Sequence, residues 1–156
     1  MSDGSIRPAT PADLDGVVAC VTALFVQDSG TRDPLRNQGW PAAHAAEWCA
    51  GMIAAPSALV LVATDGEDVV GHLIGDLMPA SDMWTGARAE LVSMYVDPAS
   101  RGAGVGGRLV DAFVAWAKDG GAARLTVTAY AENEAALALY RKHGFAPLSI
   151  ISTVDL

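Results

Sequence analysis

The chain of 156 residues contains little cysteine, few cations and no long apolar run. Its two cysteines, Cys20 and Cys49, lack the spacing of metal ligands, so we expect free, buried thiols. No apolar stretch reaches the roughly 18 residues that span a bilayer. The start, MSDGSIRPAT, lacks the basic and apolar segments of a secretory signal. These absences predict a cytoplasmic protein that does not contact membranes.

The shortage of cations gives a formal net charge of −8, which argues against binding to nucleic acid. The charge is uneven along the chain. Residues 1–97 carry thirteen acidic and four basic side chains, whereas residues 98–156 carry five acidic and six basic ones. Two interpretations stay open. The asymmetry is either an ordinary solvated surface, or an acidic part that attracts a cationic ligand beside a balanced part that holds an anionic one.

Hydrophobic periodicity predicts one α+β domain over residues 5–156. Helical spacing covers residues 11–25, 41–54, 104–118 and 133–143, and Thr10, Pro11 and Asp13 form a helix-start pattern. Strand patterns cover residues 6–7, 58–64, 69–78, 88–96, 124–129 and 145–156. The order β-α-α-β-β-β-α-β-α-β predicts a mixed, mostly antiparallel sheet flanked by about four helices. The polar segment 27–39 is a candidate substrate lid.

Four glycines stand in the segment DPASRGAGVGG, residues 97–107, between a strand pattern and a helix pattern. A Walker loop is excluded because Gly107 is followed by Arg108 and Leu109. The dinucleotide pattern G-x-G-x-x-G is present, but the strand ends too early and too little chain follows. The remaining pattern, R-x-x-G-x-G, predicts a turn whose backbone N–H groups bind an anion at a helix N-terminus. A merely flexible turn is the alternative.

The segments LVSMYVDPASRGAGVGGRLV and LTVTAYAENEAALALYRKHGF resemble the GNAT superfamily of acetyl-CoA-dependent N-acetyltransferases. The resemblance covers essentially the whole domain. It implies that the pyrophosphate of coenzyme A lies on the backbone of Arg101, Gly102, Ala103, Gly104, Val105 and Gly106. The pantetheine arm would pair with the strand at Met94, Tyr95 and Val96. Asn133 would contact the pantetheine or cap its own helix.

The resemblance also implies the catalytic groups. Tyr140 lies two helical turns after Asn133 and would protonate the departing thiolate, with core packing as the alternative. Glu90 is the candidate base. Strict alternation puts it on one strand face with Met94 and Val96, where a carboxylate would be desolvated. An exposed charge or an ion pair with Arg88 is the alternative for Glu90.

The expected reaction moves an acetyl group from acetyl-CoA to a primary amine of a small molecule or peptide, by direct attack and without a metal. A module that binds acyl-CoA without catalysis is the alternative. His44, His72 and His143 show no ligand spacing, although His72 could face the cleft. Trp40 and Trp84 border loops that would flank the acceptor, so either is a candidate to line an amine pocket, with packing as the alternative. Exposed strand edges near the C-terminus allow a homodimer.

Overall fold

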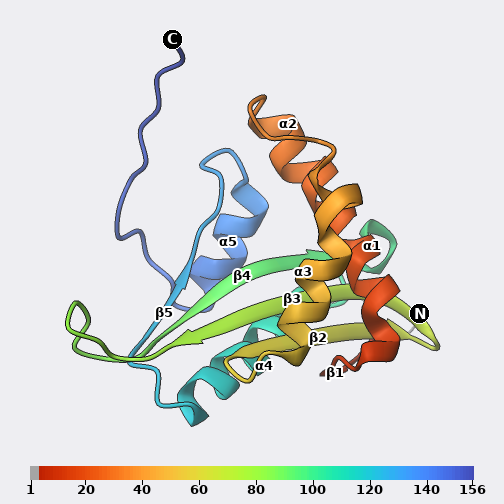
Figure 1. Cartoon of the computed structure of the whole chain (residues 1–156), viewed down its shortest axis with the longest axis horizontal. Helices are drawn as coiled ribbons and strands as arrows, with labels where there is room; N and C mark the ends of the chain where they lie inside the picture. The colour runs from red at the N-terminus through yellow and green to blue at the C-terminus, as the bar shows by residue number, and fades with distance from the viewer. Residues whose placement is uncertain (1–3) are drawn as a thin grey trace.

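The computed structural model describes residues 4–156 and consists of one five-stranded sheet with helices on both faces (Figure 1). The strands are β1 (Ser5–Pro8), β2 (Ala58–Asp65), β3 (Asp68–Met78), β4 (Arg88–Val96) and β5 (Arg124–Val127). They lie in chain order, and each pair is antiparallel except β4 and β5. The helices are α1 (Leu14–Leu24), α2 (Gly30–Arg32), α3 (Ala46–Ala54), α4 (Val105–Asp119) and α5 (Glu134–Lys142). The expected mixed, mostly antiparallel α+β fold is confirmed.

The first helix begins at the predicted pattern. Asp13 accepts a hydrogen bond from the backbone N–H of Thr10 at 2.8 Å, and Arg7 donates to both of its carboxylate oxygens at 2.7 and 2.9 Å. These bonds, led by the one from Arg7, hold the pKa of Asp13 well below its usual range. The carboxylate thus joins β1 to the short turn that starts α1.

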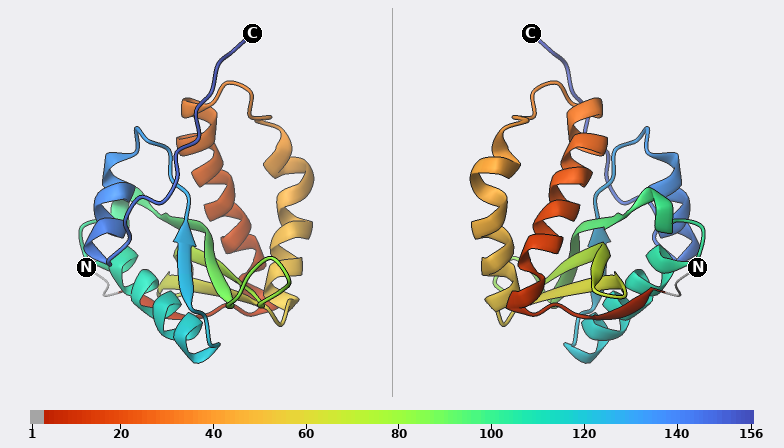
Figure 2. Two further views of the ribbon diagram at one scale, coloured as in Figure 1. Left: turned by 90° about the vertical axis from the view of Figure 1, so that its left-hand side faces the viewer. Right: turned by 90° about the vertical axis from the view of Figure 1, so that its right-hand side faces the viewer.

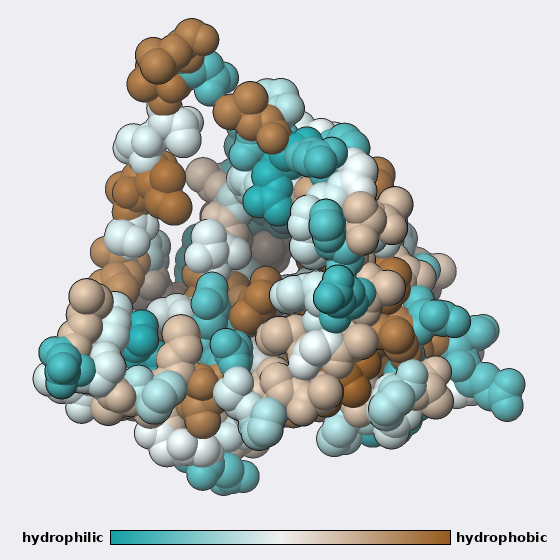
Figure 3. Space-filling model, viewed as in Figure 1, coloured by the Kyte–Doolittle hydropathy of each residue, from teal (hydrophilic) through white to brown (hydrophobic). Residues whose placement is uncertain are grey.

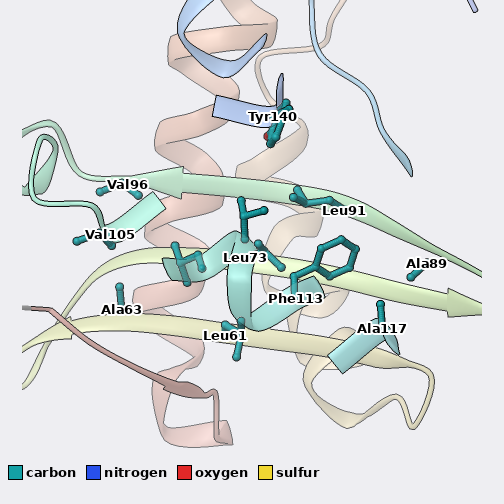
Figure 4. Close-up of a cluster of buried hydrophobic side chains, with 12 residues drawn as sticks. Leu61, Ala63, Leu73, Ala89, Leu91, Val96, Val105, Phe113, Ala117 and Tyr140 are labelled. Carbon is teal, nitrogen blue, oxygen red and sulfur yellow. The ribbon is translucent and has the colours of Figure 1, made fainter. Parts of the chain in front are cut away.

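Two apolar cores lie on opposite faces of the sheet (Figure 2). Helix α4 contributes Leu109, Val110 and Phe113 to one core, which Figure 4 shows, and α1 and α3 cover the other. Burial of each such side chain stabilises the fold by about 1.5–3 kcal/mol. Gly75 lets α4 approach closely, because a Cβ there would lie 2.7 Å from the Phe113 ring.

A bulge in β4 changes which side chains share a face. Ile74 of β3 lies opposite Ser93, but Gly75 lies opposite Leu91, so Val92 is left over. Leu91 and Met94 therefore both face α4, although strict alternation would separate them. Glu90, which precedes the bulge, points to the other face. The expectation that Glu90 shares a face with Met94 and Val96 is wrong, because one extra residue reverses the alternation.

The strand expected over residues 145–156 is also wrong. The segment has no regular secondary structure and runs away from the sheet (Figure 1). A strand pattern needs a hydrogen-bonding partner, and this segment has none among the described residues. The element order therefore ends at α5. Cys20 and Cys49 are free and buried, as expected.

Candidate functional site

Strands β4 and β5 separate half-way along β4. Their pairing covers Arg88–Leu91 of β4 and Arg124–Val127 of β5, after which no strand of the described chain lies on that side of β4. The N–H of Asp97 bonds to the carbonyl of Val70 in β3 at 2.7 Å. Because backbone groups alternate along a strand, the N–H and C=O of Met94 and the N–H of Val96 point away from β3, to the open edge, whereas the Val96 carbonyl accepts a hydrogen bond from Arg101. This edge can pair with an extended ligand.

The open edge leads directly into the glycine turn. A short helical turn, Pro98–Ser100, follows β4, and Gly102 and Gly104 have φ angles of 87° and 79°. A Cβ at Gly102 or Gly104 would meet no atom of the described residues within 4 Å, so the turn is open on that side. Helix α4 starts at Val105, and its first N–H groups have no helical acceptors. With the positive end of the helix dipole, they can bind an anion.

The side chain of Arg101 is engaged within the protein. Its Nε donates to the Val96 carbonyl at 2.8 Å and its Nη2 to Oε1 of Gln27 at 2.7 Å. The guanidinium also lies 5.5 Å from the centre of the Tyr95 ring. Arg101 therefore fastens the glycine turn to β4 and to the start of the segment 27–39. The part of the turn that remains open is its backbone from Gly102 onward, since the N–H of Arg101 bonds to the Pro98 carbonyl.

Helix α5 lies against the first turns of α4. Leu139 of α5 packs close to Gly106 of α4, since a Cβ added at Gly106 would lie 3.5 Å from the Leu139 side chain. His143 Nε2, just after α5, lies 3.2 Å from Oδ1 of Asp111 in α4. Asn133 caps α5, because its side chain accepts a 3.2 Å hydrogen bond from the N–H of Ala136. The expected capping role is thus confirmed.

Tyr140 projects from α5 toward the sheet, and Figure 4 shows it beside β4. Its ring is buried and meets Phe145 edge to face, with 5.8 Å between centroids. Burial, followed by the charge of Asp28, raises the pKa of Tyr140 to about 12. The phenol is therefore neutral at physiological pH and keeps its O–H proton. The core packing that was the alternative for Tyr140 is confirmed by this contact with Phe145, and it is compatible with a donor role for the hydroxyl.

A pocket of about 310 Å³ lies on the other face, between the end of α1, α3 and β4. Phe25 stacks on Trp40 with 6.1 Å between centroids, and Trp48 meets Trp40 edge-on at 6.2 Å. Trp40 lines the pocket, as expected for one of the two tryptophans. Trp84 does not line it; the Arg88 guanidinium lies over the Trp84 ring at 3.7 Å from its centre.

Several lining residues were not predicted: Phe25, Trp48, Val92 and Ser93. Ser29 and Arg36, which also line the pocket, lie in the segment 27–39, the candidate substrate lid. The available signal was the spacing of Trp40 and Trp48, eight residues apart and hence on one helix face.

His72 is fully buried and reaches the pocket only through Ser93. Its Nε2 lies 2.8 Å from Ser93 Oγ, and its Nδ1 has no hydrogen-bond partner among the described residues. Burial lowers the pKa of His72 to about 3, so the imidazole is neutral. This residue is a core histidine that orients a hydroxyl at the pocket wall.

Glu90 lies on the same face of β4 as Ser93, because their partners in β3, Asp76 and Ile74, are two residues apart. It pairs across the sheet with Asp76 and is half-buried, and it is not one of the lining residues. No ion pair with Arg88 forms within the part of the chain that the structure describes. Since Tyr140 packs on the α4 side, Glu90 and Tyr140 stand on opposite faces of β4.

A family model described as acetyltransferase (GNAT) matches residues 18–145. This chain belongs to the GNAT family. A curated relative, "Aminoglycoside N(6')-acetyltransferase type 1" of Klebsiella aerogenes, is 30% identical over 138 residues, 83% of this chain and 90% of the relative. GNAT proteins use acetyl-CoA as the acetyl donor.

Solved structures share the fold over nearly the whole chain. A mutant of the BH1408 protein from Bacillus halodurans superposes with a TM-score of 0.85 at 20% identity, over 97% of this chain and 99% of that one. An aminoglycoside N-acetyltransferase, AAC(6')-Iy in complex with CoA, gives a TM-score of 0.74 at 14% identity, over 97% and 98%.

Two further features concern residues 4–156 alone. None of the helices there is both long and apolar enough to cross a membrane. No group of three or more His, Cys, Asp or Glu side chains in that range is arranged to hold a metal ion.

Proposed function

We propose that this GNAT protein transfers an acetyl group from acetyl-CoA to a primary amine. The proposal depends on one observation: the open backbone edge at Met94 and Val96 runs directly into the open glycine turn at Gly102–Gly104. The open edge of β4 can hydrogen-bond to the amide groups of a pantetheine arm, and the glycine turn can bind a pyrophosphate. The relative solved with CoA has the same fold and supports this assignment.

In this proposal the backbone binds the donor and side chains contribute little. The N–H groups from Gly102 to Gly106 hold the pyrophosphate, since that of Arg101 already bonds to the Pro98 carbonyl at 3.3 Å, and the edge at Met94–Val96 holds the arm. Acetyl-CoA supplies a reactive thioester. A main-chain N–H on that edge stabilises the oxyanion that forms when the amine attacks. Asn133 keeps α5 beside the edge through its cap.

Tyr140 donates a hydrogen bond to the departing sulfur. Its pKa of about 12 exceeds that of an ordinary thiol, about 8.5, so complete proton transfer to the thiolate costs about 5 kcal/mol. The phenol therefore stabilises the thiolate as it forms, and solvent completes the protonation. The raised pKa keeps the donor proton in place over the whole physiological range.

The amine must reach the thioester without its proton. An alkyl ammonium has a pKa near 10, and an apolar pocket favours the neutral amine because it disfavours the charged one. Glu90 is not one of the lining residues, so this proposal gives it no direct contact with the amine. Ser93 Oγ, held by His72, is the polar group of β4 at the pocket wall.

Two assays test the proposal. Acetyl-CoA should raise Tm, because at 100 times its Kd it stabilises the folded state by about 2.7 kcal/mol. NAD and ATP should leave Tm unchanged. Addition of a panel of primary amines should release free thiol from acetyl-CoA. Binding without thiol release from any amine would favour the non-catalytic module. Absence of binding at high excess would contradict both functions.

A further inference from the structure

The pocket beside β4 has walls that discriminate among amines. Phe25, Trp40 and Trp48 form a continuous aromatic wall, and Val92 and Ser93 of the bulge also line the pocket. The volume of about 310 Å³ is at the lower end of the roughly 300–1,000 Å³ typical of small-molecule sites. Such walls suit one flat apolar group, which offset or edge contacts with aromatic rings would hold.

Among the described residues that line this pocket, Arg36 alone carries a charge. Its guanidinium lies 5.0 Å from the centre of the Phe25 ring, and the side chain is exposed, so it stands at the pocket mouth. It takes part in none of the ion pairs formed by residues 4–156. A guanidinium in this position matches a carboxylate on a ligand.

The acidic side chains of the segment 27–39 are directed elsewhere. Asp28 forms an ion pair with Arg32 at 2.7 Å, and its charge helps to raise the pKa of Tyr140. Asp33 accepts a 3.0 Å hydrogen bond from the N–H of Leu35. The lining residues of the pocket, all within the described chain, thus offer no carboxylate to a second or third ammonium group. This matters because polycations are bound by groups of opposite charge.

We infer that the acceptor is a primary amine that also carries a flat apolar group and a carboxylate, the chemistry of an aromatic amino acid. The ring lies among Phe25, Trp40 and Trp48, the carboxylate meets Arg36, and the amine reaches the β4 bulge at Ser93. This inference rests on the proposed acetyl transfer and specifies its acceptor. The site then disfavours polycationic acceptors such as aminoglycosides, despite the similarity to a protein named for them.

The test measures thiol release with phenylalanine, phenethylamine and kanamycin. Phenethylamine lacks the carboxylate, and kanamycin is a polycation. We expect kcat/KM for phenylalanine to exceed that for phenethylamine about tenfold, the usual size of one charge-assisted contact. Arg36→Gln should reduce this preference to about twofold. Arg124→Gln, an exposed arginine of β5 remote from the pocket, should leave the preference unchanged.

Three outcomes would overturn the inference and leave acetyl transfer standing: kanamycin as the best acceptor, an unchanged preference in Arg36→Gln, or no thiol release from phenylalanine while another amine is acetylated. Failure of acetyl-CoA to bind would instead overturn the proposed function itself. The two failures are therefore distinguishable.

The C-terminal tail, residues 145–156, stands off the body of the molecule, and Figure 3 shows hydrophobic residues along it. Half of the large apolar side chains exposed in the described chain belong to this tail: Leu148, Ile150, Ile151, Val154 and Leu156. The tail lies away from the acceptor pocket, whose lining includes none of these residues.

Discussion

The Nε of Arg101 lies 2.8 Å from the carbonyl oxygen of Val96, and the same guanidinium reaches Gln27 through Nη2 at 2.7 Å. One side chain therefore connects the end of β4, the glycine turn and the segment 27–39. The geometry gives Arg101 a positioning role: it sets where the backbone of the turn stands relative to the open edge of β4.

Arg101→Lys should weaken acetyl-CoA binding, because one ammonium does not reproduce the two hydrogen bonds of the planar guanidinium. We expect Kd to rise about tenfold while the free energy of unfolding falls by no more than about 1.5 kcal/mol. Calorimetric titration and urea unfolding measure the two quantities. An unchanged Kd would show that the turn holds its position without Arg101.

Gly104→Val should abolish acetyl-CoA binding. The φ of 79° strains a branched residue, and the added side chain would fill the open space above the turn. Gly121→Val is a matched control, because Gly121 has a φ of 80°, also faces open space and lies beyond the other end of α4. The control should lose similar stability but keep its affinity for acetyl-CoA. Equal affinities in the two variants would contradict the anion site.

Tyr140→Phe should reduce kcat about 100-fold, within the range for loss of one hydrogen-bond donor to a developing anion, with little change in acetyl-CoA affinity. The phenylalanine preserves the packing on Phe145. Because the pKa of Tyr140 is about 12, the wild-type pH profile of kcat should show no loss from phenol ionisation below about pH 11. Wild-type turnover in the variant would exclude the phenol as the donor.

The buried His72 should make the fold sensitive to acid. In the unfolded chain its pKa is near 6.5, but in the folded chain it is about 3. Between these values the unfolded state binds the extra proton, so stability falls as the pH falls. From pH 7 to pH 5 this costs about 2 kcal/mol. His72→Gln should lose that much less over the same interval in urea unfolding. Parallel curves for the two proteins would mean that His72 titrates normally in the folded state.

The fold and the glycine turn were predictable because their signals are local. Helix starts, strand runs and the R-x-x-G-x-G segment each depend on a few adjacent residues. The bulge at Val92 was not predictable, because the residues near it read as an ordinary strand. Its effect on the direction of Glu90 follows only from the pairing of β3 with β4.

The acceptor pocket was only partly predictable for a related reason. Its aromatic residues come from separate segments, Phe25 at the end of α1 and Trp40 and Trp48 near α3, and only the tertiary packing brings them to the β4 bulge. The tail shows the converse case. Its strand pattern is real, but a pattern of apolar residues does not provide a partner strand within the same chain.

The most direct test of the central claim is the change in backbone amide chemical shifts when the ¹⁵N-labelled protein is titrated with CoA. The account predicts that the largest changes fall at Met94 and Val96 and at Gly102–Gly106, with smaller changes elsewhere. Saturable binding that leaves these amides unshifted, and instead moves residues around Leu14 and Ile53 at the other end of the α1–α3 layer, would contradict it.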